Sequence, residues 1–173
     1  MRTWRLPADV DTDQLAPGPA MKHGIDVIAR HCLEAVRPDF AAGVRRGDVI
    51  VAGPHFGIGS SREQAAAVLV HLGVAAVVAP SFGGLFFRNA FNIGLLLLVC
   101  REAERIGDGV GLALDPLGGL VLPSGGAPLA VEPTPPCLLG MVQAGGPVPQ
   151  LKERLAALTG SRNGPCIFRS HRA

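Results

Sequence analysis

Residues 53–65 of the chain read GPHFGIGSSREQA, and this glycine-rich stretch decides how its surroundings are interpreted. It follows the apolar residues 49–52, which predict a buried strand, and it precedes residues 65–72, which predict a helix. The first N–H groups of a helix have no partner within it, and they carry the positive end of the helix dipole. A strand, a glycine-rich turn and a polar helix start therefore predict an anion-binding turn built on backbone N–H groups.

Two glycines and an arginine give this turn its chemical character. Gly57 and Gly59 allow backbone conformations that are closed to residues with a Cβ, and they allow a ligand to approach the chain closely. Arg62 adds a planar fork that is suited to binding a carboxylate through two hydrogen bonds. The turn is therefore a candidate site for a carboxylate.

The two serines of the turn have two interpretations. Ser60 stands three residues before Glu63, and Ser61 stands three residues before Gln64, so either serine fits the capping-box pattern of a helix N-cap. A serine at a helix start is usually only a cap, and a nearby arginine is usually solvated. From spacing alone, both the structural and the functional interpretation stay open.

Composition narrows the class of protein. The 173 residues fit one domain, and 48% of them are hydrophobic while 17% are charged, which excludes a disordered chain. The formal net charge is +2 and no basic block is present, so the composition gives no support for nucleic-acid binding. We expect a compact, rather apolar domain over residues 1–159 and a flexible, basic tail over residues 160–173.

The cysteines and the apolar segments predict a cytoplasmic protein without a metal site of its own. No two cysteines have the CxxC spacing of zinc or iron–sulfur sites. The start of the chain has no hydrophobic core of a signal peptide, and the apolar residues 93–100 are too short to span a bilayer. We interpret the four cysteines as reduced thiols: Cys32, Cys100, Cys137 and Cys166.

The middle of the chain predicts a β–α–β–α–β unit. Short, continuously apolar runs suit strands that are covered on both faces, and helical stretches lie between them. Such a unit has parallel strands and right-handed crossovers. The expected elements are strands over residues 49–52, 74–79 and 95–99, a helix from Ser61 to near Gly73, and a helix over residues 85–92.

The flanking segments are less regular. We expect Asp26 to cap a helix that reaches about Ala35. After Cys100 the turns become dense, which favours a meander of short strands, and a final helical region begins at Pro136. The expected short strands are residues 109–114, 119–122 and 129–131.

Ordered motifs resemble the small, swivelling domain of the aconitase superfamily. Residues 57–65 (GIGSSREQA) resemble its signature, residues 11–15 (DTDQL) its N-terminal element, and residues 79–82 (APSF) with 87–95 (FRNAFNIGL) its third landmark. Residues 143–146 (QAGG) fit its C-terminal end. The resemblance implies an α/β fold, a three-layer β/β/α swivelling domain. The length is similar to that of free-standing small subunits, those of 3-isopropylmalate dehydratase and homoaconitase.

The resemblance also implies a function. In this family a large partner subunit carries a [4Fe-4S] cluster, and the two subunits form a heterodimer or heterotetramer that isomerises a small hydroxy-carboxylic acid by dehydration and rehydration. The implied activity is that of a hydro-lyase, most simply in leucine biosynthesis. A related homoaconitase or dimethylmalate-type dehydratase is the alternative, and a non-catalytic anion-binding module is another.

Roles carry over to the matching positions of this sequence. The resemblance implies Ser60 as the catalytic base. The remaining implied residues are Gly59, Ser61 and Arg62 for substrate binding, Asp11, Thr12, Asp13 and Gln64 for support, and Met21, Lys22 and His23 in the loop that selects the substrate.

The sequence departs from the family pattern at two places. Gln64 stands where the family usually has histidine, so this position cannot titrate. The loop over residues 16–24 lacks the Ala-Arg-Tyr-Leu-like sequence of many relatives. This difference leaves open whether isopropylmalate or another hydroxy acid is the substrate. Lys22 is able to pair with an extra carboxylate, although an exposed loop lysine is the simpler interpretation. Loop histidines such as His23 and His55 are more often solvated than catalytic.

Overall fold

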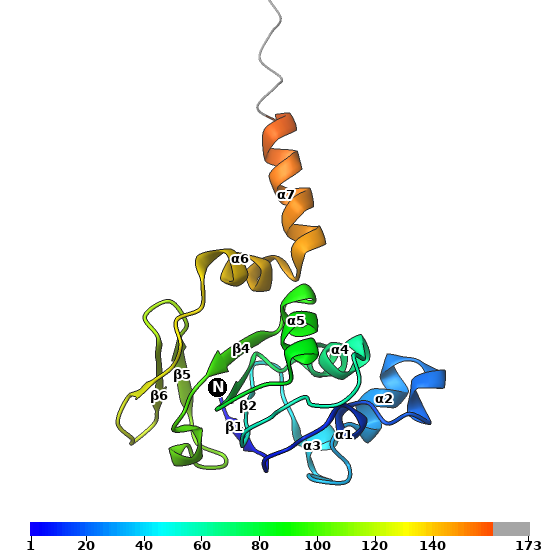
Figure 1. Cartoon of the computed structure of the whole chain (residues 1–173), viewed down its shortest axis with the longest axis vertical. Helices are drawn as coiled ribbons and strands as arrows, with labels where there is room; N and C mark the ends of the chain where they lie inside the picture. The colour runs from blue at the N-terminus through cyan, green and yellow to red at the C-terminus, as the bar shows by residue number, and fades with distance from the viewer. Residues whose placement is uncertain (161–173) are drawn as a thin grey trace, which may run out of the picture.

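The computed structural model describes residues 1–160 and contains two sheets (Figure 1). A four-stranded parallel sheet has the strand order β1-β2-β3-β4, and a three-stranded antiparallel meander has the order β5-β6-β7. The strands are β1 (Thr3–Arg5), β2 (Val49–Val51), β3 (Ala76–Ala79), β4 (Leu96–Val99), β5 (Leu112–Asp115), β6 (Leu120–Pro123) and β7 (Leu129–Ala130).

Helices cover one face of the parallel sheet and the meander covers the other (Figure 1). The helices are α1 (Thr12–Leu15), η1 (Ala20–His23), α2 (Ile25–His31), α3 (Phe40–Gly43), α4 (Glu63–His71), α5 (Gly84–Asn92), η2 (Ala103–Arg105), α6 (Pro136–Ala144) and α7 (Pro147–Gly160). Ile50 of β2 faces the helices, whereas its neighbours Val49 and Val51 face the meander, as the two-residue period of a strand requires. The expected three-layer β/β/α fold is confirmed.

Most of the predicted elements are present. The β–α–β–α–β unit is confirmed as β2-α4-β3-α5-β4 with parallel pairing, and the meander after Cys100 is confirmed as β5-β6-β7. The helix expected to reach Ala35 ends at His31 instead. Leu33 adopts a left-handed conformation (φ 60°) and its N–H donates to the carbonyl of Gln14 at 2.8 Å, which turns the chain back onto α1.

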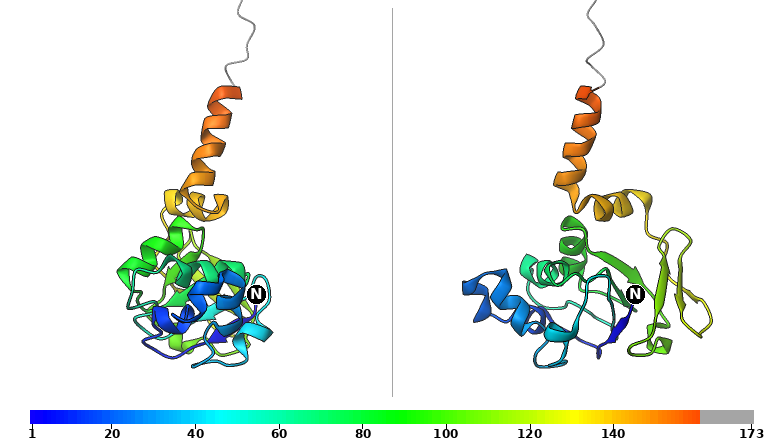
Figure 2. Two further views of the ribbon diagram at one scale, coloured as in Figure 1. Left: turned by 90° about the vertical axis from the view of Figure 1, so that its right-hand side faces the viewer. Right: turned by 180° about the vertical axis from the view of Figure 1, so that it is seen from behind.

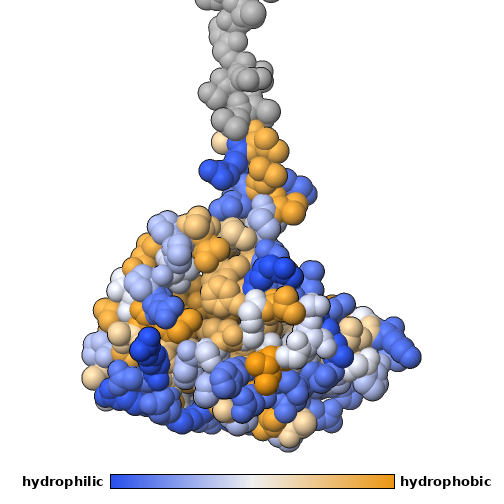
Figure 3. Space-filling model, in the orientation of Figure 1, coloured by the Kyte–Doolittle hydropathy of each residue, from blue (hydrophilic) through white to orange (hydrophobic). Residues whose placement is uncertain are grey.

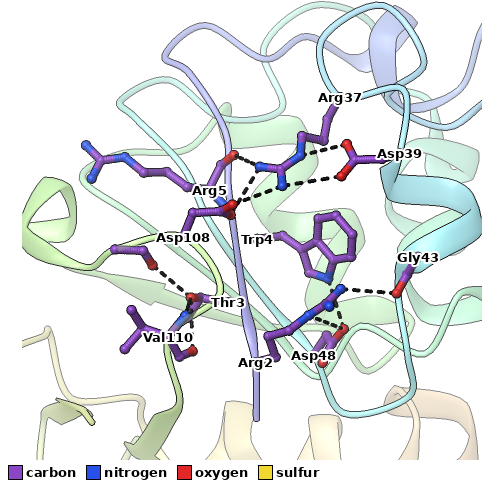
Figure 4. Close-up of polar contacts among 11 residues, drawn as sticks. Arg2, Thr3, Trp4, Arg5, Arg37, Asp39, Gly43, Asp48, Asp108 and Val110 are labelled. Carbon is purple, nitrogen blue, oxygen red and sulfur yellow. Dashed lines mark hydrogen bonds and ion pairs between the residues drawn. The ribbon is translucent and has the colours of Figure 1, made fainter. Parts of the chain in front are cut away.

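Strand β1 was not predicted, and Figure 4 shows what holds it. The indole of Trp4 lies between the guanidinium groups of Arg2 and Arg37, which are 4.3 and 5.0 Å from the ring centroid. The indole N–H donates to Asp48 at 2.9 Å. Arg37 also binds Asp108 at 3.0 Å, and this contact holds the pKa of the Asp108 carboxyl below its usual range.

The C-terminal helices extend the molecule beyond the three layers. Helix α7 projects away from the globule, and its first turn lies beside α6 (Figures 1 and 2). Hydrophobic side chains lie along one side of α7 (Figure 3), where Val148 and Leu151 are 62% and 57% exposed. The tail expected over residues 160–173 lies outside the described residues from residue 161 onward. Within residues 1–160, no helix is both long and apolar enough to cross a membrane.

Candidate functional site

The glycine-rich turn leaves the C-terminal end of β2 and runs beside the segment that follows β1. Backbone hydrogen bonds join the two segments at regular intervals, so each residue of the turn has a fixed neighbour. The donors and acceptors are Gly53 N–H to Pro7 O (3.1 Å), Asp9 N–H to Pro54 O (2.9 Å), Gly57 N–H to Val10 O (2.7 Å) and Thr12 N–H to Ile58 O (2.9 Å). We call this set the backbone ladder of the site.

Gly57 and Gly59 meet the steric demands of the turn. Both are left-handed, with φ values of 75° and 102°. A Cβ on Gly57 would lie 2.3 Å from the ring of Phe86, which forms the floor of the turn from α5. A Cβ on Gly59 would lie 3.1 Å from Thr12 Oγ1. The glycines are therefore required both for conformation and for close approach.

The backbone of Ser60 is fixed while its side chain is exposed. The Ser60 N–H donates to Thr12 Oγ1 at 3.0 Å, and Thr12 is only 1% exposed. Thr12 is placed by α1, whose N-cap Asp11 forms a capping box with Gln14. The structure thus brings the DTDQL segment against the serine turn and leaves the Ser60 hydroxyl facing solvent.

Arg62 is held by the same N-terminal segment. Its guanidinium forms an ion pair with Asp13 and donates to the carbonyl of Ala16 at 3.2 Å. The Arg62 side chain is 25% exposed, whereas that of Asp13 is 63% exposed. The Arg62 guanidinium therefore has a fixed direction. A ligand carboxylate that binds this guanidinium must share its N–H groups with Asp13.

Neither serine caps helix α4, so the expectation of a serine N-cap is wrong. The helix begins at Glu63, and its N-cap is Arg62, which makes no side-chain capping bond. The physical reason lies in tertiary contacts: the Ser60 N–H is bound by Thr12, and the Ser61 carbonyl accepts a hydrogen bond from Asn89 at 3.1 Å. These contacts orient the turn differently from a local capping box.

The turn keeps free backbone donors. Within residues 1–160, the N–H groups of Gly59, Ser61 and Arg62 donate to no acceptor. They precede the first turn of α4, where the helix dipole is positive. Glycine turn, free donors and Arg62 together form a site that suits an anion.

Four of the implied residues have no hydrogen bond or ion pair with the Ser60 hydroxyl or the Arg62 guanidinium in the described part of the chain. Gln64 is exposed, and its side chain forms no hydrogen bond within the described part of the chain. Met21 is partly buried and packs against the helix-side core. Lys22 and His23 are exposed, and no hydrogen bond or ion pair among residues 1–160 links either one to Ser60.

A surface hollow is lined by part of the loop over residues 16–24 and by helix α2. It has a volume of about 320 Å³, and His23, Pro17 and Val27 are among its lining residues. A neighbouring hollow of about 390 Å³ borders Asp11 and Asp13 and shares Pro17 with the first. The two hollows are therefore neighbours, and the second borders Asp13, the ion-pair partner of Arg62.

The cysteines do not form a metal site in the described residues. No group of three or more His, Cys, Asp or Glu side chains in that part of the chain is placed to hold a metal ion. Cys32 and Cys100 are buried, and burial raises the pKa of the Cys32 thiol to about 12. Cys137 is exposed on α6. An iron–sulfur cluster, which needs several thiolates together, does not fit these residues.

Known proteins resemble this chain over most of its length. The family model of the aconitase C-terminal domain matches residues 39–103. The methanogen homoaconitase small subunit of Methanothermobacter thermautotrophicus is 41% identical over 84% of this chain and 85% of its own length. The 3-isopropylmalate dehydratase small subunit 1 of Archaeoglobus fulgidus is 40% identical over 84% of this chain and 91% of its own. The chain belongs to this aconitase-superfamily family of small subunits.

A solved structure agrees with this membership. The crystal structure of 3-isopropylmalate dehydratase from Methanocaldococcus jannaschii superposes with a TM-score of 0.84 at 35% identity, and the match covers 94% of this chain and 97% of that one. The resemblance drawn from the sequence motifs is therefore confirmed, as is the swivelling-domain fold.

Sequence reasoning did not foresee one contact of the site. Asp9 and His55 join the two segments of the backbone ladder by a side-chain contact of 2.9 Å. Both residues are left-handed, with φ values of 58° and 62°. Sequence alone gives no signal for this pair, because aspartate and histidine 46 residues apart carry no spacing rule.

Proposed function

We propose that the chain is the small subunit of a heteromeric hydro-lyase that isomerises a hydroxy di- or tricarboxylic acid by dehydration and rehydration. The observation that carries the proposal is the exposed Ser60 hydroxyl on a turn with free N–H groups, directly beside Arg62. The names of the relatives favour 3-isopropylmalate and leucine biosynthesis. We propose a cytoplasmic location together with this biosynthetic role.

Ser60 is proposed as the base that removes a proton from the carbon beside a substrate carboxylate. A serine is a poor base in water, so its alkoxide must be stabilised. The free N–H groups of Ser61 and Arg62, and the positive end of α4, supply such stabilisation without reorganisation. The bond from Ser60 N–H to Thr12 keeps the serine backbone fixed while its side chain reacts.

Arg62, with Ser61 and Gly59, is proposed to bind the substrate carboxylate. The fork of Arg62 is suited to two parallel hydrogen bonds, and the open backbone at Gly59 allows the ligand to approach. Asp13 and Ala16 O hold Arg62 in place before the substrate arrives. As the Ser60 alkoxide takes the proton, the C–H electrons form a double bond to the adjacent carbon, whose C–O bond breaks and releases hydroxide. In the rehydration, hydroxide adds to the carbon that lost the proton, and the Ser60 hydroxyl returns its proton to the carbon that lost the hydroxyl.

A large partner subunit is proposed to complete the site. The family implies a [4Fe-4S] cluster that binds the leaving hydroxyl, and the described residues of this chain do not fit one, so the cluster is assigned to the partner. The exposed apolar side chains of α7 and the half-buried ones of α6 are of the kind that a permanent interface covers. The assembly is a heterodimer or heterotetramer.

The loop with Lys22 and His23 favours a second candidate substrate. Both side chains are exposed, Lys22 carries a positive charge, and no ion pair within residues 1–160 includes either residue. A loop of this character suits an additional carboxylate better than an apolar group, which is consistent with the homoaconitase relative. A dimethylmalate-type dehydratase and a non-catalytic anion-binding module remain as alternatives from the same site.

The test is reconstitution with the large subunit encoded in the same genome. We expect dehydration and rehydration of 3-isopropylmalate or of the hydroxy tricarboxylic acid used by homoaconitases. Ser60→Ala should lower kcat by about 10²–10⁴-fold, the range of general-base catalysis. Ser124→Ala changes an exposed serine in the turn between β6 and β7; it is the matched control and should keep full activity.

The outcome also distinguishes a catalytic small subunit from a non-catalytic anion-binding module. A Ser60→Ala complex with unchanged kcat would exclude Ser60 as the base. Calorimetric titration of the isolated chain with dicarboxylates should show weak binding if the partner completes the site. Tight binding by the isolated chain, with no turnover in the complex, would favour the non-catalytic module.

A further inference from the structure

Three residues other than glycine are left-handed in residues 1–160, and all three contact the segment that carries the DTDQL motif. Asp9, Leu33 and His55 have φ values between 58° and 62°. Asp9 lies in that segment, His55 binds Asp9, and the Leu33 N–H donates to Gln14 O. Left-handed backbone is costly for residues with a Cβ and persists only where the surroundings determine it. Left-handed residues gather around this one segment, which indicates that the surrounding contacts hold its backbone in a strained conformation.

The Asp9–His55 pair sits inside the backbone ladder. The imidazole Nδ1 lies 2.9 Å from Asp9 Oδ1, and the Asp9 N–H donates to Pro54 O at 2.9 Å. The His55 N–H donates to the hydroxyl of Ser81, which belongs to the loop after β3. The side-chain pair therefore joins the N-terminal segment to the serine turn, and the backbone N–H of His55 joins both to a third loop.

Burial does not explain this pair. Both side chains are 63% exposed, and exposed ion pairs contribute little to stability. Two residues in strained conformations joined by an exposed contact are a poor arrangement for stability. The arrangement does set the register between the two segments of the ladder.

The register set by the pair reaches Ser60. Thr12 lies three residues after Asp9 and Ser60 lies five residues after His55, and the two segments meet again where Ser60 N–H donates to Thr12 Oγ1. We propose that Asp9 and His55 are a positioning pair that holds Ser60 in its reactive place. The proposal rests on the proposed function, in which Ser60 takes the proton.

Substituting His55 by glycine distinguishes an effect on the position of Ser60 from an effect on the stability of the fold. At a φ of 62° glycine has no Cβ penalty, so His55→Gly removes the pair and the strain together. We expect the melting temperature of the variant to change by less than about 3 °C, because the lost contact and the relieved strain offset each other. We expect kcat to fall about tenfold or more, because small misplacements of a reacting group are costly.

The kinetic experiment uses the complex with the large subunit. His55→Gly and Asp9→Gly should each lower kcat with little change in KM, since Arg62 has its own anchors in Asp13 and Ala16. The double variant should be no slower than the slower single variant. His55→Asn tolerates the left-handed region and keeps a donor for Asp9, so it should recover most of the activity.

The matched control is another exposed histidine–aspartate pair. His71 binds Asp26 at 3.2 Å, between the end of α4 and the start of α2. His71→Ala should leave kcat unchanged. Unchanged kcat in His55→Gly, additive losses in the double variant, or a melting temperature that falls together with kcat would each overturn the positioning role.

A second measurement does not need turnover. Amide hydrogen exchange of the full chain reports on the Ser60 N–H directly, and His55→Gly should speed its exchange about tenfold as the ladder loosens. Exchange that stays at the wild-type rate would overturn the proposal. If the wild-type complex has no activity, the proposed function fails while the exchange experiment still decides the positioning role.

Discussion

The side-chain oxygen of Thr12 accepts the backbone N–H of Ser60 at 3.0 Å, across 48 residues of sequence. The first prediction follows from this contact. Thr12→Val keeps the buried shape but removes the acceptor, which leaves the Ser60 N–H without its partner at a cost of about 1–3 kcal/mol. We expect a lower melting temperature and, in the complex, a lower kcat. Calorimetry and steady-state kinetics measure the two effects.

Thr12→Ser is the control for that variant. It keeps the hydroxyl and loses a methyl group in a site that is 1% exposed. We expect some loss of stability but nearly normal kcat. If Thr12→Val and Thr12→Ser lower kcat equally, the hydrogen bond is not what positions Ser60.

The second prediction concerns the floor of the turn. In Gly57→Ala the new methyl group would meet the Phe86 ring at 2.3 Å, at a backbone φ of 75°. Overpacking alone costs about 1–3 kcal/mol, and the left-handed backbone adds to it. Thermal unfolding should therefore show a melting temperature lower by several degrees. Gly84→Ala is the matched control, because Gly84 has open space around its Cβ position and begins α5, so its melting temperature should stay equal or rise.

The strands of the fold were predictable where the local sequence is a continuous run of apolar residues. Residues 49–52, 74–79 and 95–99 are continuously apolar, and each contains a strand covered on both faces. Strand β1 has only three residues, Thr3, Trp4 and Arg5, and another arginine, Arg2, precedes it. Its position depends on contacts with Arg37, Asp48 and Asp108, which no local pattern indicates.

The site was predictable in its members but not in its geometry. The motifs named Ser60, Arg62 and the DTDQL segment, and the structure brings them together. The spacing of Ser60 and Glu63 fits the capping-box pattern, but no capping box forms there. A capping box does form between Asp11 and Gln14. The conformation of the serine turn is determined by tertiary hydrogen bonds, and these bonds come from segments that are distant in sequence.

The third prediction is an acid effect at the β1 cluster. Arg37 lowers the pKa of Asp108 from its usual value of 3.8 by its hydrogen bond. A lowered folded-state pKa means that the contribution is fully present above the unfolded pKa and is lost as pH falls through the folded one. Asp108→Asn should therefore be less stable than wild type at pH 7, by at most about 1 kcal/mol for an exposed pair. In urea unfolding, the difference should shrink as the pH falls below the unfolded aspartate pKa of about 3.9.

A variant elsewhere shows whether that effect belongs to the cluster. Asp115 is exposed on β5 and accepts only a local N–H, from Gly118. Asp115→Asn should give a much smaller difference at pH 7. If Asp108→Asn differs from wild type by the same amount at pH 3 and pH 7, the ionised carboxylate is not the cause.

The fourth prediction concerns the fork of Arg62. In Arg62→Lys the charge remains, but the ammonium cannot make the two parallel bonds of a guanidinium and cannot hold Asp13 and Ala16 in the same way. We expect KM to rise about tenfold, which corresponds to about 1.4 kcal/mol of lost binding. Arg105→Lys, at an exposed position paired with Glu102, is the control and should leave KM unchanged. If Arg62→Lys lowers kcat alone and leaves KM unchanged, Arg62 acts on the Ser60 alkoxide and not on the substrate carboxylate.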